Sequence, residues 1–386
     1  MSLTALKDLK DLKALTNFPE DIYTGLALPE KALPLKQTAK EVFVEAKMTN
    51  DEIKAKEGTY FDGKGYTIFD EDVDVYAMID GKKKLIAKLR KQVIDPAIIK
   101  TGWEGFWIAA GPSRNRGAAA GPIAVKSNYW KNRNPVNISG WSANETLQGK
   151  VSKMRINNNV FSSVLGYFNA TPFMKLPCRI TSYTMRYWKY YKHGLPFIHA
   201  IDYCFKSLVP DKYALQRKAA EQMPLVHIAG TSFSSVTINR NFRTALHKDD
   251  GDFKEGYGNL SVIERGWYHG GYTVMPEFNI GFNVRTGDFL AMDVHQWHCN
   301  TELYESAEEK EKNKKLPRIH KDSLKTGTLG AEKPFSRVSF VCYLREKLRE
   351  CDSNKTRKFY KKVGYIYKSN SFTAKKRTKH TSDGAE

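Results

Sequence analysis

The sequence has no apolar run that approaches the roughly 20 residues needed to span a bilayer. Residues 1–18 also lack the apolar stretch of a secretory signal. Cysteine is scarce, and no two cysteines have the CxxC spacing: the five are Cys178, Cys204, Cys299, Cys342 and Cys351. This small, odd number argues against a disulfide scaffold or a disulfide-linked partner. We therefore expect an intracellular, soluble protein, located in the nucleus of a eukaryote or in the cytoplasm of a prokaryotic or virus-infected cell.

Acidic residues are few relative to basic ones. The chain of 386 residues carries 62 Lys and Arg against 42 Asp and Glu, a formal net charge of +20. Such an excess favours a polyanionic partner, most commonly nucleic acid, although a basic protein without one has the same composition. Ten of the basic residues lie in the segment 351–386, which we expect to be a tail available to a phosphate backbone.

The chain divides into three parts. Leucines at helical spacing from Leu3 to Leu15 predict an amphipathic helix within residues 1–35. One domain follows over 36–350, with helical and irregular support over 36–224 and strands over 225–350. The charged stretch 305–333 has too few apolar residues for a core strand, so it is expected to be an exposed insertion.

Local patterns in the first half predict a mixture of elements. We expect a hairpin over 59–69, a basic helix over 81–92 and a long irregular loop over 102–135. Three helices should follow, over 178–192, over 194–210 with Pro196 in its first turn, and over 210–222.

After residue 225 the pattern changes to short alternating strands separated by turns. These segments are GTSFSSVTINRNFRTALH, GNLSVIERG, GGYTVMPEFNIGFNVRTGDFLAMDV and SRVSFVCYLRE. Regularly spaced short strands of this kind are typical of a β-sandwich or an open barrel.

A candidate metal site lies on these strands. His247 and Asp249 form an H-x-D motif, and side chains two apart on a strand point to the same side. A third ligand is available from His298, ten residues after Asp288, or from His295. Two histidines and one carboxylate form the ligand set of non-haem Fe(II) oxygenases, whereas a single neighbouring cysteine argues against zinc. We favour His298, and His295 either orients a ligand or is simply exposed.

An arginine on the last strand provides a carboxylate-binding group. Arg337 can bind a carboxylate through two N–H groups, and Ser339, two residues along, shares its face. Together they could accept the distal carboxylate of 2-oxoglutarate. The charged insertion lengthens the gap from His298 to Arg337 to 39 residues. If the insertion reshapes the site, Arg345 is the substitute for Arg337 as the carboxylate-binding residue.

Residues from about 110 to 350 resemble the Tet/JBP family of 2-oxoglutarate oxygenases. The resemblance rests on SFSSVTINRNFRTALHKDDGDFKEGYGNL, on GGYTVMPEFNIGFNVRTGDFLAMDVHQWHCNTEL and on RVSFVCYLRE. The segments SRNRGAAAGPI and SSVLGYF resemble the JBP-type and phage branches in particular. Membership would imply an α+β fold, a double-stranded β-helix (jelly-roll) core flanked by helices.

The resemblance also implies a chemistry. Iron would be bound by His247, Asp249 and His298, and 2-oxoglutarate by Arg337 with Ser339, while Asn241 and Arg243 would line the pocket. The expected reaction hydroxylates the methyl group of thymine or 5-methylcytosine in DNA, with 2-oxoglutarate and O₂ converted to succinate and CO₂. The sequence does not distinguish the two bases.

DNA contact would use basic residues near the site. A base in a duplex must be flipped out to reach the metal. Residues on the loop that are suited to phosphate contact are Arg114, Arg116, Lys126, Lys131 and Arg133. The stretch 183–192 interleaves aromatic and basic residues, which fits either a stacking surface or an aromatic core with a basic exterior.

Two other functions fit the sequence. An oxygenase of this kind could act on a protein, a nucleotide or a small molecule instead of DNA. Alternatively, the chain could be a non-catalytic, basic nucleic-acid-binding protein, because fold and function are separable.

Overall fold

The computed structural model describes side chains over residues 35–122, 158–172, 175–223, 225–316 and 334–362, and the backbone of the strands at 142–145 and 151–156. The predicted N-terminal helix lies outside these residues, as do Lys126, Lys131 and Arg133. Among the described residues, no helix combines the length and apolar composition that crossing a bilayer requires.

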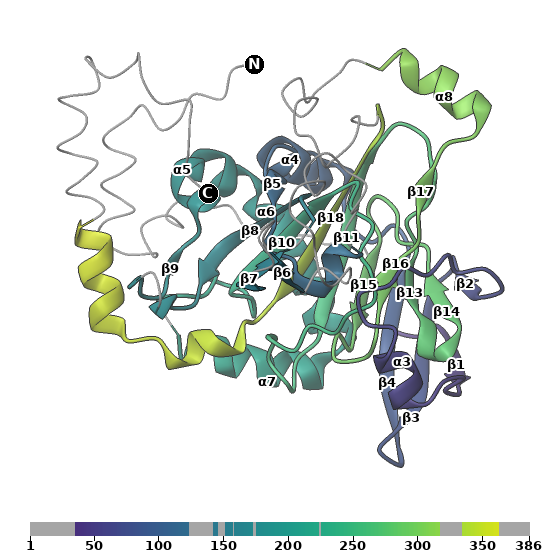
Figure 1. Ribbon diagram of the computed structural model, residues 1–386, viewed down its shortest axis with the longest axis horizontal. Helices are drawn as coiled ribbons and strands as arrows, with labels where there is room; N and C mark the ends of the chain where they lie inside the picture. Colours follow the sequence, from purple (N-terminus) through teal and green to yellow (C-terminus); the bar gives the residue numbers. More distant parts are fainter. Residues whose placement is uncertain are drawn as a thin grey trace.

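A ten-stranded mixed sheet runs through the middle of the molecule (Figure 1). Its strands in spatial order are β1 (Lys40–Val44), β3 (Val73–Ile79), β4 (Lys82–Arg90), β15 (Phe289–Met292), β11 (Gly258–Arg265), β18 (Ser336–Tyr343), β10 (Ser235–Arg240), β8 (Val160–Phe168) and β5 (Pro112–Ser113), with β9 (Arg179–Ile180) also paired to β8. Neighbouring strands are antiparallel except for β1 and β3. The sheet therefore joins strands from both halves of the chain.

A second, four-stranded sheet packs against one face of the first. Its order is β16 (Cys299–Asn300), β13 (Thr273–Met275), β14 (Ile280–Phe282) and β2 (Thr67–Phe69). Leu290 and Met292 of β15 pack with Phe282 in the apolar cluster between the two sheets, whereas Phe289 and Ala291 belong to the cluster on the other face. This alternation follows from the two-residue period of a strand.

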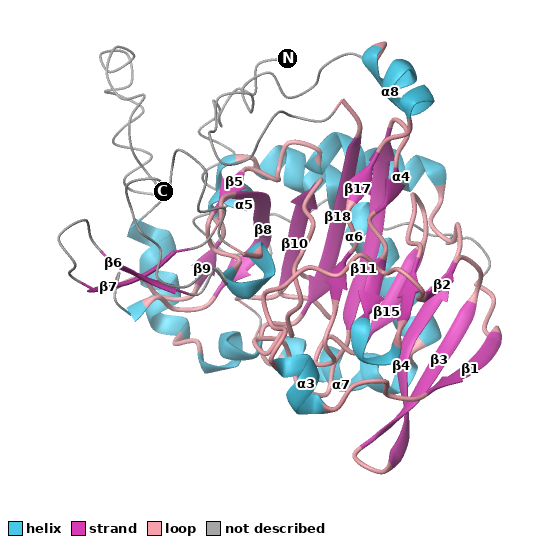
Figure 2. Ribbon diagram, turned by 45° about the vertical axis from the view of Figure 1, so that its right-hand side comes forward, coloured by secondary structure: helices cyan, strands magenta, loops and turns pink. Residues whose placement is uncertain are grey.

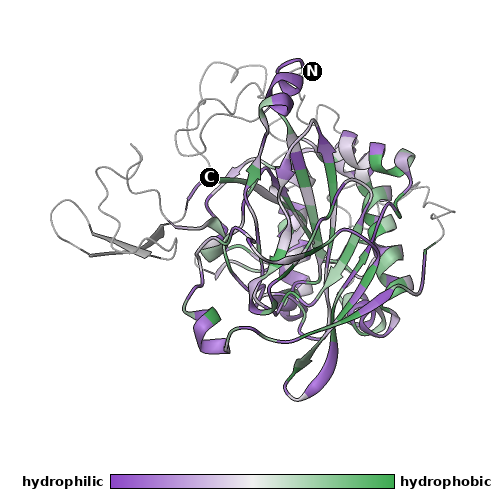
Figure 3. Cartoon of the chain, turned by 90° about the vertical axis from the view of Figure 1, so that its right-hand side faces the viewer, coloured by the Kyte–Doolittle hydropathy of each residue, from purple (hydrophilic) through white to green (hydrophobic). Residues whose placement is uncertain are grey.

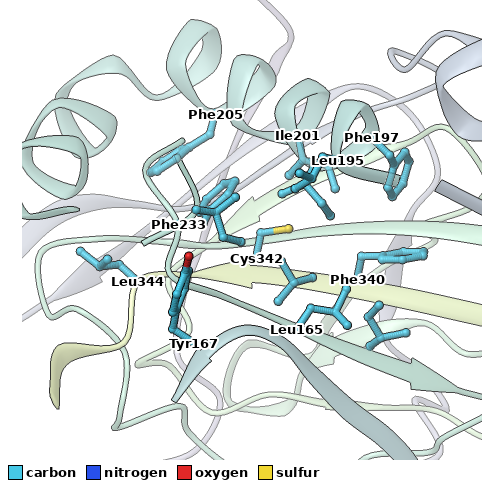
Figure 4. Close-up of a cluster of buried hydrophobic side chains, with 14 of the residues drawn as sticks. Leu165, Tyr167, Leu195, Phe197, Ile201, Phe205, Phe233, Phe340, Cys342 and Leu344 are labelled. Carbon is cyan, nitrogen blue, oxygen red and sulfur yellow. The ribbon is translucent and has the colours of Figure 1, made fainter. Parts of the chain in front are cut away.

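Helices cover the opposite face of the large sheet (Figure 2). They are α4 (Pro96–Phe106), α5 (Ser182–Arg186), α6 (Trp188–Leu208) and α7 (Pro210–Glu221). Ile198, Ile201, Phe205 and Leu208 of α6 are buried as predicted. In Figure 4, Phe197 of α6 lies beside Phe340 of β18, and their ring centroids are 4.9 Å apart. Gly105 and Gly194 allow α4 and α6 to approach closely, since a Cβ at Gly105 would lie 2.6 Å from the Tyr190 carbonyl oxygen.

The structure corrects the prediction of a basic helix over 81–92. This segment is strand β4, which pairs with β3 through a turn at Asp80 and Gly81, both with positive φ. Asp-Gly is a sequence signal for a two-residue hairpin, and the apolar residues of β3 precede it. The expected hairpin over 59–69 is also wrong: it contains only β2, which pairs in parallel with β14.

The helix boundaries around Pro196 are also different from the prediction. Helix α6 is continuous from Trp188, so Pro196 lies in its interior and not in a first turn, while β9 and α5 occupy part of 178–192. Helix α7 agrees with the prediction. Within the predicted loop 102–135, residues 102–106 belong to α4 and Gly117–Ala120 form a 3₁₀ turn.

The charged insertion begins with a helix, α8 (Ala307–Lys314), which has a capping box between Ser306 and Glu309. Figure 3 shows α8, at the top of that view, mostly in the hydrophilic colour. Asn313 alone among its residues is buried, and it hydrogen-bonds the backbone of Trp267 through both of its side-chain groups. The described part of the insertion is therefore an exposed helix held to the domain by the Asn313 amide and by Glu309, which lies 3.1 Å from His269 Nε2.

One pair of cysteines forms a disulfide within the chain, which the small, odd number of cysteines did not lead us to expect. Cys178 and Cys351 are bonded, with a Cα–Cα distance of 5.8 Å. The bond fixes the start of a helical segment, 353–362, whose Tyr360 lies in the core and whose Thr356 hydroxyl donates to the Cys178 carbonyl oxygen. The sequence does not reveal the pair because 173 residues separate the two cysteines.

Replacing both Cys178 and Cys351 by serine should lower the free energy of unfolding by about 2–4 kcal/mol. Closing so long a loop removes entropy from the unfolded chain. Thermal unfolding with and without a thiol reductant measures the effect. Equal melting temperatures for the wild type and the double variant without reductant would contradict this expectation.

His199 of α6 should make stability depend on pH. It is buried, its Nε2 has no hydrogen-bond partner, and burial together with the nearby charge of Arg217 lowers its pKa from 6.5 to about 4. Between these values the unfolded chain binds the additional proton, so stability is complete above pH 6.5 and is lost as the pH falls towards 4. The shift corresponds to about 3 kcal/mol. In denaturant titrations, the free energy of unfolding of His199→Leu relative to the wild type should rise by this amount as the pH falls from 6.5 towards 4. A difference that stays constant with pH would contradict the prediction.

Candidate active site

Three potential metal ligands converge where two loops meet. His247 follows β10 and His298 precedes β16, and their backbones form an antiparallel bridge with N–O distances of 3.1 and 3.0 Å. The ligand atoms of His247, Asp249 and His298 all lie within 4.8 Å of one another. The Asp249 carboxylate is 3.7 Å from His247 Nε2 and 3.6 Å from His298 Nε2. One ion could therefore contact all three side chains.

Hydrogen bonds orient the two imidazoles. Nδ1 of His247 is 2.8 Å from the Ala245 carbonyl oxygen, and Nδ1 of His298 is 2.9 Å from that of Gln296. With Nδ1–H donating to these carbonyls, each Nε2 presents a lone pair to the cluster. This is the tautomer that a metal ligand requires.

The charge states also suit a cation. Burial and the neighbouring His298 lower the pKa of His247 to about 4, so its imidazole is neutral. Burial would raise the pKa of the Asp249 carboxyl, but its contacts with His298 and His247 hold it below its ordinary value, and the same carboxylate raises the pKa of His298 against the effect of burial. The cluster therefore offers a carboxylate anion between two imidazoles.

His295 lies outside this cluster. Its Nδ1 is 3.3 Å from Asp293 Oδ1, and that contact and the Asp293 charge raise its pKa against the effect of burial. The structure thus groups His298, and not His295, with His247 and Asp249.

A cavity of about 390 Å³ adjoins the cluster. Alternation along β18 sends Arg337, Ser339 and Val341 into it, while Val338, Phe340 and Cys342 pack under the helices. Thr237 and Asn239 of β10 line it as well. The large sheet is therefore apolar on its helical face and polar where it faces the cavity.

Arg337 has free hydrogen-bond donors inside the protein. It is 4% exposed, and its Nε and Nη2 have no hydrogen-bond partner. Burying a guanidinium with unused donors is costly, so a ligand that accepts from both would be strongly favoured. Arg345 also lines the cavity, but its Nε donates to Asn169 Oδ1 at 2.6 Å.

The other predicted residues are distributed differently. Arg116 lines the cavity, whereas Arg114, Asn241 and Arg243 are not among its lining residues. Asn241 supports the neighbouring strand: its Oδ1 accepts from the Arg337 backbone N–H, and its own N–H donates to the Arg337 carbonyl oxygen. Arg243 stacks on Tyr60 and pairs with Glu302.

Residues 183–192, which interleave aromatic and basic side chains, do not form a stacking surface. Trp188 and Tyr191 are buried, while Arg186 and Lys189 are exposed. The stretch is therefore an aromatic core with a basic exterior.

Sequence reasoning missed Asp252. Its side chain lines the cavity, Oδ2 is buried without a hydrogen-bond partner, and burial and the charge of Asp249 raise its pKa. Its place three residues after Asp249 in the same loop is the one sequence signal that could have identified it. Tyr343 was also missed, although the alternation on β18 puts it on the face of Arg337.

Two imidazoles and a carboxylate beside a buried arginine with free donors define a class of enzymes, the Fe(II)/2-oxoglutarate-dependent dioxygenases. Residues 163–346 match the Tet/JBP family model, described as the oxygenase domain of the 2OGFeDO superfamily. Residues 163–346 are therefore a Tet/JBP-type oxygenase domain, and the superfamily of this domain uses Fe(II) with 2-oxoglutarate and O₂.

Curated relatives share this part of the chain. Thymine dioxygenase JBP1 of Trypanosoma brucei brucei is 34% identical over 169 residues, which are 42% of this chain and 20% of that protein. The bifunctional helicase and thymine dioxygenase JBP2 of Leishmania infantum is 33% identical over 188 residues, 48% of this chain and 15% of that protein. The chain thus matches a fifth or less of the length of these relatives.

Among solved structures, NgTET1 in complex with 5mC DNA matches with a TM-score of 0.44 and 10% identity. The match covers 93% of this chain and 99% of that one.

Proposed function

We propose that this protein hydroxylates the methyl group of a 5-methylpyrimidine, thymine or 5-methylcytosine, in DNA. The observation that carries the proposal is the cluster of His247, Asp249 and His298 beside a cavity that also contains Arg337. The names of the curated relatives as thymine dioxygenases and the net charge of +20 support a DNA substrate.

In this proposal His247, Asp249 and His298 hold Fe(II). The fit rests on the donor set, on the two Nδ1 contacts that direct both Nε2 atoms to the cluster, and on the ionised Asp249. Three protein ligands on one side leave positions open for co-substrates. Bound iron with 2-oxoglutarate and O₂ would supply the oxidising chemistry, with succinate and CO₂ as products.

Arg337 and Ser339 would bind the distal carboxylate of 2-oxoglutarate. The unpartnered Nε and Nη2 of Arg337 match the two oxygens of a carboxylate, and Ser339 shares its face of β18. Burial excludes water, which strengthens this charged contact.

We further propose that the two packed sheets form a double-stranded β-helix core and that the catalytic unit spans residues 36–350. The strands β1, β3 and β4 support these limits, because they extend the same sheet as β11 and β18 beyond the matched segment. Truncation to residues 163–346 would remove these strands.

The DNA would deliver a flipped base to the cavity, since a stacked methyl group cannot approach a metal that lies within the protein. Arg116 in the cavity wall, the exposed Arg114 two residues before it and exposed basic residues of 353–362 could contact the substrate or its phosphates. Because such contacts release counterions, activity on DNA should fall steeply with added salt.

The test is a reaction of anaerobically Fe(II)-loaded protein with 2-oxoglutarate, O₂ and DNA that carries thymine or 5-methylcytosine. Mass spectrometry of the nucleosides should show a gain of one oxygen on one base, absent when 2-oxoglutarate is omitted. Succinate without a base product would exclude DNA as the substrate and leave a protein, nucleotide or small molecule. No succinate and no iron binding would contradict catalysis.

A further inference from the structure

Glu264 lies directly opposite Arg337. The two residues are paired in the antiparallel ladder of β11 and β18, and Val262, two residues before Glu264, faces the small sheet as the cavity side of β18 does. Opposite charges at such cross-strand positions ordinarily form an ion pair. Yet the two side chains form no direct ion pair: Arg337 hydrogen-bonds Tyr268 and feels Glu264 only through its charge, and its Nε and Nη2 have no hydrogen-bond partner among the described residues.

The reason is that other groups occupy the Glu264 carboxylate. Oε1 is 3.1 Å from Arg285 Nη1 and accepts a hydrogen bond from the Tyr268 hydroxyl. Oε2 accepts from the Thr286 N–H at 2.7 Å and from the Thr286 hydroxyl at 3.0 Å. Burial would raise the pKa of Glu264, but Tyr268 and Arg285 hold it below its ordinary value, so the group is an ionised carboxylate with its acceptor positions filled.

Arg285 is itself held firmly in place. Its Nε donates to Asn283 Oδ1 at 2.5 Å and its Nη2 donates to the Gly270 carbonyl oxygen at 3.2 Å. Its guanidinium stacks on the Tyr268 ring, 4.7 Å from the centroid. The turn that presents it is closed by Asp288, which accepts from the Arg285 N–H at 2.8 Å.

A glycine next to Arg337 keeps space for the guanidinium. Gly271 has a φ of +69°, and a Cβ there would lie 3.2 Å from Arg337 Nε and 2.6 Å from a Leu303 methyl carbon. The polypeptide therefore approaches the arginine closely without accepting a hydrogen bond from its Nε.

We propose that Arg285 is a positioning residue that sequesters Glu264 and so keeps Arg337 free for the carboxylate of 2-oxoglutarate. The inference rests on the proposed role of Arg337. Without Arg285, Glu264 would lose its cationic partner and turn to the nearest buried cation across the ladder. An internal carboxylate would then compete with the co-substrate for the same two N–H groups.

The test compares Arg285→Gln, Glu264→Gln and the double variant. The dissociation constant for 2-oxoglutarate is measured by calorimetry on Mn(II)-substituted protein, so binding is read without turnover. We expect at least a tenfold rise for Arg285→Gln and values within threefold of the wild type for Glu264→Gln and for the double variant. Arg217→Gln, which breaks an arginine–carboxylate pair on α7, is the matched control and should bind like the wild type.

Rescue by the second substitution distinguishes competition from a structural defect. If the double variant binds as weakly as Arg285→Gln, or if Arg285→Gln binds like the wild type, the inference is overturned. Should Arg285→Gln fail to fold, Arg285→Lys keeps a cation for Glu264 and should bind within threefold of the wild type; a loss as large as tenfold would contradict the inference. Wild-type protein that binds no 2-oxoglutarate would instead overturn the proposed function.

Discussion

Replacing His247 by alanine is expected to eliminate Fe(II) binding and base oxidation together. The substitution removes one of three ligand atoms that lie within 4.8 Å of one another and leaves Asp249 with one imidazole neighbour. Loss of a group that merely orients a metal ligand already costs about 10–100-fold in affinity or activity, so loss of a ligand should exceed that. Anaerobic Fe(II) titration and nucleoside mass spectrometry measure the two effects.

His295→Ala is the matched control for this prediction. The residue is a partly buried histidine only three positions from His298, and it contacts Asp293 and not the cluster. This variant should bind iron and oxidise DNA within a few-fold of the wild type. A loss with His295→Ala as large as that with His247→Ala would mean that the ligand set is assigned incorrectly.

Replacing Arg337 by glutamine should raise the KM and the Kd for 2-oxoglutarate about a hundredfold. Each charge-assisted hydrogen bond contributes about 1.5–3 kcal/mol, and the lost pair is buried. Since 1.4 kcal/mol corresponds to a factor of ten, the loss of a single strong bond already accounts for this change. Iron binding should remain, because Arg337 is not part of the cluster.

Arg345→Gln separates the two candidate arginines. Arg345 lines the same cavity, but Asn169 already accepts from its Nε. Its replacement should change the Kd for 2-oxoglutarate less than fivefold. The reverse pattern, with a large effect at Arg345 and a small one at Arg337, would mean that Arg345 binds the distal carboxylate of 2-oxoglutarate.

Much of the site was predictable because it is encoded locally. His247 and Asp249 are two residues apart, and Arg337 and Ser339 are two apart on one strand, so the period of an extended chain puts each pair on one side. The strands β10, β11, β15 and β18 were likewise predicted from their alternating side chains. The helical face of α6 followed from the spacing of Ile198, Ile201 and Phe205.

Errors occurred where local signals were ambiguous. The lysines and leucines of 82–90 are compatible with a helix until Asp80 and Gly81 are recognised as a turn and β15 provides a partner strand. A proline usually ends or kinks a helix. Helix α6 nevertheless continues through Pro196, and its residues on both sides of the proline are buried. In both cases tertiary packing outweighed local preference.

The sequence by itself determined the chemistry available to this protein: which residues can bind a metal or a carboxylate, and which strand faces carry them. Only the tertiary structure decided which of these groups meet. It grouped His298, and not His295, with His247 and Asp249, paired Glu264 with Arg285 on the strand opposite Arg337, and joined Cys178 to Cys351 across 173 residues. The physical reason is that side-chain periodicity fixes direction along one element, whereas distance between elements depends on how the whole chain packs.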